Sequence, residues 1–201
     1  MKSTYEIHIG KALQDAWNIF LRAPEVFTIL TLAYLLLYYV CAHLPLLGPL
    51  LTLLVTPLFY PSVFLLAEQD RKNGKADFSV LKNVLPLAPQ LLMVALLRTI
   101  FVTIGLICFL LPGIYLAVSY TFAQLIVLEE KKTFWEALEG SRALVRGNWF
   151  TVFGLWFFAT LLFVSGFLLA GIGILVTAPV SILMLYCAYR EILRGTVVVV
   201  T

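Results

Sequence analysis

Long apolar stretches alternate with short polar segments along this chain of 201 residues. A bilayer core of about 30 Å needs about 20 consecutive apolar residues of helix. Stretches of about this length recur, and they lack the two-residue alternation that is typical of a membrane barrel strand. The pattern predicts six membrane-spanning helices: Glu25–Leu44, Pro49–Ala67, Pro89–Leu110, Ile114–Leu128, Asn148–Ala170 and Ile174–Tyr189.

Three further segments show apolar and polar faces at helical spacing, and each precedes an odd-numbered span. They are Gly10–Arg22, Asp77–Leu85 and Thr133–Arg146. In the last of them, Thr133 and Glu136 have the spacing of a capping box. Such amphipathic helices lie in the headgroup plane with the apolar face toward lipid. The alternative is that they pack on protein at the cytoplasmic side, and the sequence leaves both placements open.

The order of elements repeats three times: amphipathic helix, span, short uncharged turn, span. The copies cover about residues 9–70, 76–130 and 133–194. Ala23-Pro24 precedes the first span as Ala88-Pro89 precedes the third. The repeat predicts an all-α, polytopic membrane protein with a single membrane domain, 1–201, and three parallel copies around a pseudo-threefold axis.

The composition sharpens this class and excludes others. Apolar residues make up 62% of the chain and charged residues only 12%, which is too little polar surface for a water-soluble enzyme. The net charge of +3 is too small to indicate a nucleic-acid partner. The cysteines show neither metal-type spacing nor a disulfide framework, so we expect no metal and no cofactor.

Charge is confined to one set of connections. The turns Ala42–Pro49, Phe109–Gly113 and Leu169–Gly173 contain no charged residue. Every Lys and Arg except Arg98 lies in the remaining connections, the termini or the span ends next to them. The positive-inside rule therefore predicts a multi-pass protein of the cell membrane with both termini in the cytoplasm.

Arg98 is the strongest candidate for a polar site within the membrane. It lies inside the third predicted span, roughly 14 Å deep at 1.5 Å per residue, where an Arg costs about 2.5–3.5 kcal/mol to insert. Gln124 and Tyr120 lie at a suitable depth to be its partners if it extends toward the cytoplasmic side. Two interpretations stay open: a site for an anion or lipid headgroup, or a structural Arg between helices.

Three carboxylates end the even-numbered spans at equivalent places: Glu68, Glu129 and Glu191. A ring of carboxylates at a cytoplasmic mouth would attract cations. The alternative is that each one marks the point where lipid stops and water begins. The sequence offers no catalytic residue in these spans, because phosphate-binding, metalloprotease and serine-hydrolase motifs are all absent.

Three motifs carry a family resemblance. They are the opening Gly10–Trp17 (GKALQDAW), the segment Leu111–Leu116 (LPGIYL) and the segment Glu136–Trp149 (EALEGSRALVRGNW). With these motifs the chain resembles the integral membrane family that includes the membrane domain of glycerophosphoryl diester phosphodiesterase, together with related six-span bacterial and archaeal proteins. The resemblance implies a helical membrane domain. It transfers no catalytic residue, because catalysis in the phosphodiesterases belongs to a separate soluble domain.

These observations favour a non-enzymatic integral membrane module: an accessory, scaffold or regulatory subunit. Its partners would be the lipid bilayer and either another membrane protein or a further copy of the chain. The alternative is a transporter or channel for lipids or small solutes that uses Arg98 within the bundle. An intramembrane enzyme is a third hypothesis, and it lacks an identified catalytic group.

Overall fold

The computed structural model describes residues 8–45, 47–168 and 171–200. These residues form helices and connections, with no strand among them. In chain order the helices are α1 (Ile9–Arg22), α2 (Pro24–Ala42), α3 (Gly48–Asn73), the 3₁₀ helices η1 (Phe78–Asn83) and η2 (Leu85–Leu87), α4 (Ala88–Cys108), α5 (Leu110–Ser119), α6 (Ala123–Glu130), α7 (Phe134–Arg146), α8 (Trp149–Leu168) and α9 (Ile174–Val200).

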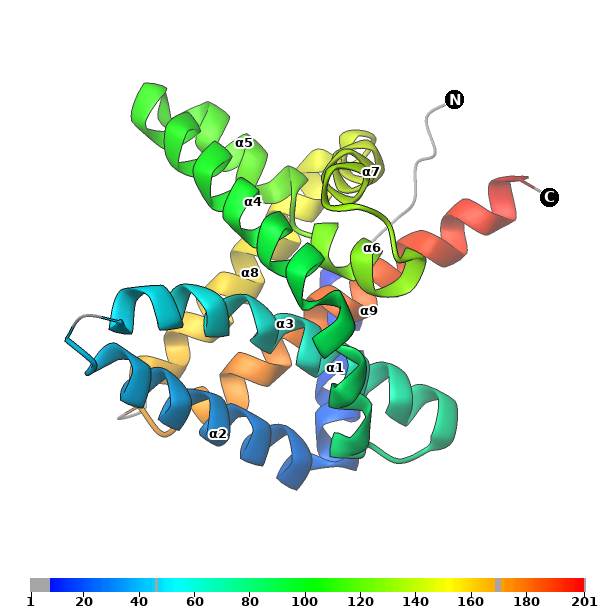
Figure 1. The fold of residues 1–201 in the computed structure, drawn as a ribbon. Coiled ribbons are helices and arrows are strands. Elements are labelled where there is room, and N and C mark those ends of the chain that lie inside the picture. Colours follow the sequence, from blue (N-terminus) through cyan, green and yellow to red (C-terminus); the bar gives the residue numbers. More distant parts are fainter. Residues whose placement is uncertain (1–7, 46, 169–170, 201) are drawn as a thin grey trace.

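The long helices pair into three hairpins, α2–α3, α4–α5 and α8–α9, each with extensive contact between its two members. The three hairpins point to the left in Figure 1, while the end of α9, α7 and the loop after α3 lie to the right. The uncharged turns are thus gathered on one side of the molecule, as the alternation of charged and uncharged connections predicts.

Five segments are long and apolar enough to cross a membrane: Pro24–Ala42, Phe78–Cys108, Leu110–Glu130, Trp149–Leu168 and Ile174–Arg194. This confirms the all-helical class and indicates a membrane protein. The predicted second span, Pro49–Ala67, lies within α3, which is not among these five segments of the described chain. Pro57 and Pro61 both lie inside this helix, which is nevertheless continuous.

The predicted fourth span differs in the structure. We expected Leu111-Pro112-Gly113 to form the turn, but α5 already begins at Leu110 and contains all three residues. Pro112 lies in the first turn of the helix, where its missing N–H costs no hydrogen bond. Gly113 allows α5 to pack closely on α4, because a Cβ on Gly105 of α4 would lie 2.9 Å from the Gly113 backbone.

The same span is also interrupted, since residues 120–122 form a turn between α5 and α6. The middle amphipathic segment differs as well: it forms η1 and η2 rather than one α-helix. Asp77 caps η1 through a hydrogen bond from the Ser79 backbone N–H. Pro86 then follows within η2, and proline cannot donate the backbone hydrogen bond that a continuous helix needs.

Each amphipathic segment packs on the second limb of a hairpin. η1 contacts α3, α7 contacts α6, and α1 contacts α9. On α1, the small side chains of Ala12 and Ala16 are buried together with Phe20. Leu13, Trp17 and Leu21 form a second apolar stripe of α1 that stays exposed. One face of α1 is therefore packed on protein and another is exposed, and the interfacial placement stays a prediction.

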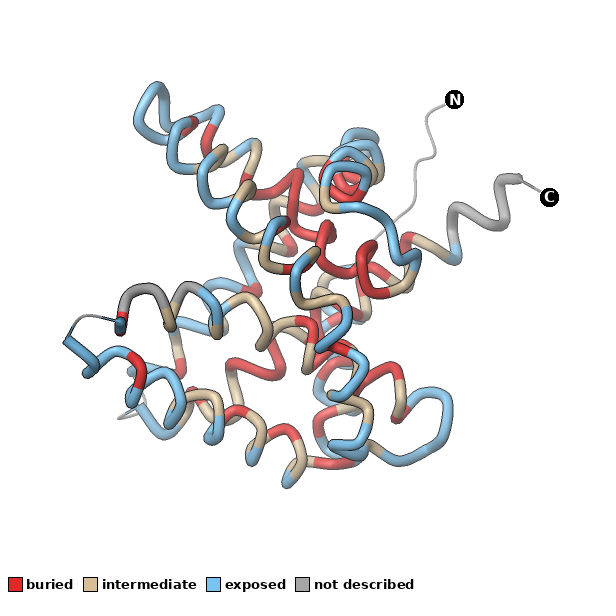
Figure 2. Tube along the Cα trace, in the orientation of Figure 1, coloured by how far each residue is buried: buried red, intermediate tan, exposed pale blue. Residues whose placement is uncertain are grey.

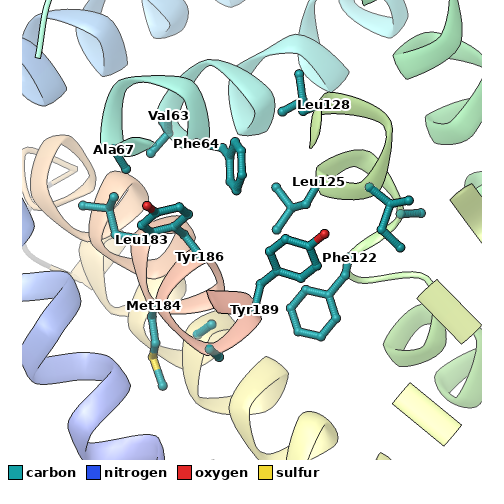
Figure 3. Close-up of a cluster of buried hydrophobic side chains, with 14 of the residues drawn as sticks. Val63, Phe64, Ala67, Phe122, Leu125, Leu128, Leu183, Met184, Tyr186 and Tyr189 are labelled. Atoms are coloured by element: carbon teal, nitrogen blue, oxygen red, sulfur yellow. The ribbon is translucent and has the colours of Figure 1, made fainter. Parts of the chain in front are cut away.

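The buried core lies at the charged side of the molecule, where α3, α6 and α9 meet, while the tips of hairpins α2–α3 and α4–α5 are largely exposed (Figure 2). Every residue from Ala123 to Leu128 of α6 is buried. Aromatic side chains fill the space between the three helices, with Phe64, Phe122, Tyr186 and Tyr189 close together (Figure 3). This aromatic core supports the charged cluster described below.

Candidate functional site

Glu68 is the centre of a cluster of charged and polar side chains at the charged side of the molecule. Its Oε1 accepts a hydrogen bond from Nη2 of Arg71 at 2.6 Å and lies 3.2 Å from Nζ of Lys72. Its Oε2 accepts hydrogen bonds from the Tyr186 hydroxyl at 2.9 Å and from Nη2 of Arg190. A buried carboxylate with this many donors links the end of α3 to α9.

These contacts change the acidity of Glu68, which follows the predicted span Pro49–Ala67. Burial alone would raise the pKa of its carboxyl, but hydrogen bonds from Arg71 and Tyr186 and the charge of Arg190 outweigh burial. The pKa of Glu68 is lowered from 4.5 to about 2. The hydrogen bond to Glu68 likewise raises the pKa of the Arg71 guanidinium. Glu68 and Arg71 are therefore both charged at neutral pH.

Arg190, within α9, joins the ends of two other helices. Its Nη2 pairs with Glu68 at the end of α3 and also with Glu129 at the end of α6. The guanidinium lies over the rings of Phe64, at 5.9 Å from the centroid, and Tyr186, at 5.7 Å. A guanidinium suits this place because it donates in several directions and stacks on aromatic faces.

Two of the three predicted mouth carboxylates thus meet, and the third lies apart. Glu68 and Glu129 share Arg190, whereas Glu191 lies 3.6 Å from Nζ of Lys11 on α1. Successive residues of a helix point about 100° apart, so Arg190 and Glu191 face different neighbours. Arg190 bridges the two carboxylates, and Arg71 and Lys72 also pair with Glu68. This arrangement differs from an open ring of acidic groups.

Arg98 lies beside the interruption between α5 and α6. Its Nη2 is 3.5 Å from the carbonyl oxygen of Ala117, which also accepts a hydrogen bond from the Thr121 hydroxyl at 3.2 Å. Ala117 belongs to the last turn of α5, where carbonyls lack helical partners and carry partial negative charge. The cation of Arg98 therefore complements a helix end inside the apolar region.

The two side chains predicted to be partners of Arg98 have other roles. Gln124 Nε2 donates a hydrogen bond to the carbonyl oxygen of Pro57 at 3.0 Å. That carbonyl would normally bind the backbone N–H of residue 61, and Pro61 has none. Tyr120 is buried, with its ring 6.3 Å from that of Phe101. Gln124 of α6 thus supplies the hydrogen bond that Pro61 cannot donate within α3.

Ser141 is a further polar residue with a defined role, which the sequence indicated only as part of the apolar arc of its helix. It is fully buried on α7. Its hydroxyl donates to the carbonyl of Ser119 at 2.7 Å and accepts from the backbone N–H of Phe122 at 3.2 Å. One side chain therefore satisfies backbone groups on both sides of the turn between α5 and α6.

A cavity of about 640 Å³ opens between α1, the end of α3 and α9. Its walls carry several charged side chains, among them Lys11, Arg22, Asp70 and Glu191. A second cavity of about 510 Å³ lies between hairpin α2–α3 and α4. Apolar side chains and threonines line it, among them Thr99, and Arg98 is not one of its lining residues.

The described part of the chain contains no group of three His, Cys, Asp or Glu side chains that could hold a metal ion. A scan against protein-family models, a search of curated proteins and a search of solved structures each find no match to this chain. The resemblance to the phosphodiesterase membrane domain therefore stays a prediction.

Proposed function

We propose that this chain is a non-enzymatic integral membrane module: an accessory, scaffold or regulatory subunit of the cell membrane, with both termini in the cytoplasm. One observation carries the proposal. Two buried polar side chains, Gln124 and Ser141, hydrogen-bond to backbone groups that a proline or a turn leaves without a helical partner. Gln124 serves the carbonyl of Pro57, and Ser141 serves both sides of the turn between α5 and α6.

This use of polar groups is what a structural module requires. Proton- and sodium-coupled transporters and intramembrane enzymes place ionisable or polar side chains near the midplane, where they face a substrate or ion. Here Arg98 faces the end of α5, and the two glutamates face Arg190. Both arrangements stabilise helix packing without leaving a reactive group in the membrane.

The proposed architecture has six spans in three parallel repeats, with α3 as the second span. The packing of the amphipathic segments supports the repeat. η1 and α7 each contact the hairpin limb that precedes them, and α1 contacts α9. If the three units form a closed ring, α9 is the limb that precedes α1. The contact between α1 and α9 is then equivalent to the other two contacts.

Co-purification tests the accessory role. The tagged full chain is extracted from its native membranes in a mild detergent and separated by size. The expected result is a complex that contains a second membrane protein at fixed stoichiometry, or further copies of the chain. A monodisperse monomer without any companion chain, obtained under conditions that preserve known complexes in the same membranes, would contradict the proposal.

A second candidate function is transport of a lipid or a small solute, and one observation favours it. The cavity beside α4 has hydroxyl side chains on its walls, including Thr56 and Thr99. Transport predicts that Arg98→Leu keeps the fold and abolishes efflux of carboxyfluorescein, or scrambling of a fluorescent phospholipid, in proteoliposomes. The accessory role predicts no such flux in the unchanged protein, and an Arg98→Leu effect on stability alone.

A further inference from the structure

The cavity between α1, α3 and α9 has the build of a ligand site. Three helices contribute one strip of residues each: Lys11, Asp15 and Arg22 from α1, Asp70 and Arg71 from α3, and Arg190 and Arg194 from α9 are among them. The volume of about 640 Å³ falls within the range of small-molecule sites, about 300–1,000 Å³.

The lining of this cavity has an excess of positive charge. Five basic side chains face three acidic ones, a difference of two positive charges. The basic residues are Lys11, Arg22, Arg71, Arg190 and Arg194, and the acidic residues are Asp15, Asp70 and Glu191. Arg71 and Arg190 already pair with Glu68 and Glu129. Lys11, Arg22 and Arg194 are therefore the lining cations that can meet an anionic group.

Asp70, in the wall of the same cavity, favours a group that donates a hydrogen bond to its carboxylate. Its side chain is only 4% exposed, and its Oδ2 accepts no hydrogen bond within the described part of the chain. Nη1 of Arg22 lies 3.6 Å from this oxygen, which is a charge contact and not a hydrogen bond. A buried carboxylate oxygen without a donor is costly, so a ligand that brings an N–H donor would be favoured here.

Arg22 is able to give way to such a donor. Its side chain is 64% exposed and is held to Asp70 only by the long contact described above. Because Arg22 is mostly in water and donates no hydrogen bond to Oδ2, it can leave Asp70 more easily than a buried, hydrogen-bonded cation could. A ligand with both a cation and an anion could therefore exchange partners with the pair: the cation takes Asp70, and the anion takes the guanidinium of Arg22.

We propose that this cavity binds a phosphate–ammonium group, the headgroup chemistry of an aminophospholipid. The primary ammonium donates to Oδ2 of Asp70. The phosphate accepts from Arg22 and from Lys11 and Arg194 of the lining. The exchange conserves charge, because one ion pair between side chains becomes two between the side chains and the ligand.

The position of α1 identifies a lipid as the source of this headgroup. Its exposed stripe of Leu13, Trp17 and Leu21 lies on a different side of the helix from the cavity. Apolar stripes with Trp are typical of helices at the membrane–water boundary. The cavity would therefore lie at headgroup level, within reach of a lipid whose chains stay in the bilayer.

Native mass spectrometry of the delipidated full chain in detergent tests this site with three lipids of identical acyl chains. Phosphatidylethanolamine should bind about tenfold more tightly than phosphatidylcholine, whose trimethylated ammonium donates no hydrogen bond, and more tightly than phosphatidylglycerol, which has no ammonium. Asp70→Asn should remove about tenfold of the affinity for phosphatidylethanolamine. Glu139→Gln, at a half-exposed carboxylate on α7 outside the cavity, should leave it unchanged.

Two further arms complete the test. Arg22→Gln changes a mostly exposed side chain, so it keeps the site testable if Asp70→Asn does not fold, and it should weaken phosphatidylethanolamine and phosphatidylglycerol alike. Free O-phosphoethanolamine should fail to displace the lipid at equal concentration. Displacement would assign the site to a soluble phosphoamine and overturn the lipid source. Equal affinity for all three lipids, or no effect of either variant, would overturn the site.

Binding at this cavity is independent of the accessory role proposed above. A chain that binds phosphatidylethanolamine without any protein companion would retain the site and lose the accessory role. A chain with a companion and no lipid preference would give the reverse result.

Discussion

Different interactions hold the helices together at the two ends of the hairpins. At the charged side, α3, α6 and α9 meet around ion pairs and hydrogen bonds, with Arg190 between Glu68 and Glu129. At the tips, helices meet through glycine, and large apolar side chains such as Ile107 and Leu168 are 80% and 84% exposed. Lipid supplies no hydrophobic force between helices, so close packing holds the tips. Apart from Arg98, the charged side chains gather at the other end.

Removing the central cation should have the largest effect on this arrangement. Arg190→Gln leaves Glu68 and Glu129 without their shared partner and should lower the free energy of unfolding by about 3–5 kcal/mol. Unfolding with a denaturing detergent measures it. Arg142→Gln is the control, because Arg142 and Glu139 form a half-exposed pair at 3.6 Å that contributes at most about 1 kcal/mol. Equal losses in the two variants would show that Arg190 has no special role.

Acid should weaken the same end of the molecule. The pKa of Glu68 is lowered from 4.5 to about 2, so its stabilisation is complete above pH 4.5 and is lost as the pH falls toward 2. The shift corresponds to at most about 3 kcal/mol. The difference in unfolding free energy between the unchanged chain and Glu68→Gln, measured across this pH range, isolates the effect from other carboxylates. A difference that does not change with pH would contradict the assignment.

The tips should respond to volume rather than to charge. Gly105→Ala places a Cβ 2.9 Å from the backbone of Gly113 and should cost about 1–3 kcal/mol, as overpacking does. Gly10→Ala is the matched control, since no atom beyond its own stretch of helix lies within 4 Å of the place that its Cβ would take, and it should cost nothing. The same unfolding assay compares them, and a harmless Gly105→Ala would mean that the hairpin α4–α5 is not tightly packed.

The smallest expected effect concerns the hydrogen bond from Gln124 to the Pro57 carbonyl of α3. Gln124→Leu leaves the carbonyl of Pro57 without its donor at 3.0 Å and should cost about 1 kcal/mol, the usual scale for such bonds in membranes. Thr99→Val removes a hydroxyl that bonds only to Ala95 of its own helix and should cost less. If Thr99→Val proves the more damaging, the link between α6 and α3 is not a stabilising one.

Helix boundaries were predictable where a single local signal decides them. Thr133 and Glu136 form the predicted capping box of α7, with both hydrogen bonds present. The prediction of a turn at Pro112-Gly113 was wrong, because proline fits the first turn of a helix as well as a turn between helices. The interruption between α5 and α6 was not predicted, because its backbone groups are satisfied by Ser141, 19 and 22 residues away in the sequence.

Candidate residues were found more readily than their partners. Arg98, Gln124, Glu68 and Glu129 all take part in contacts between helices. The expected pairing of Arg98 with Gln124 rested on depth alone, and depth does not specify which way each helix is rotated. Asp70 carried no signal, because it lies in an ordinary polar segment and only burial by other helices sets it apart.

Local properties of the chain, namely apolar length, helical spacing and the placement of charge, were enough to predict an all-helical chain with helices long and apolar enough to cross a membrane. These properties depend on neighbours within a few turns, which is why they can be recognised in the sequence. The meeting of Glu68, Glu129 and Arg190, the donor for Pro57 and the cavity around Asp70 depend on how helices far apart in the chain are rotated and packed. Glu68 and Arg190 are 122 residues apart, and only the folded arrangement brings them together.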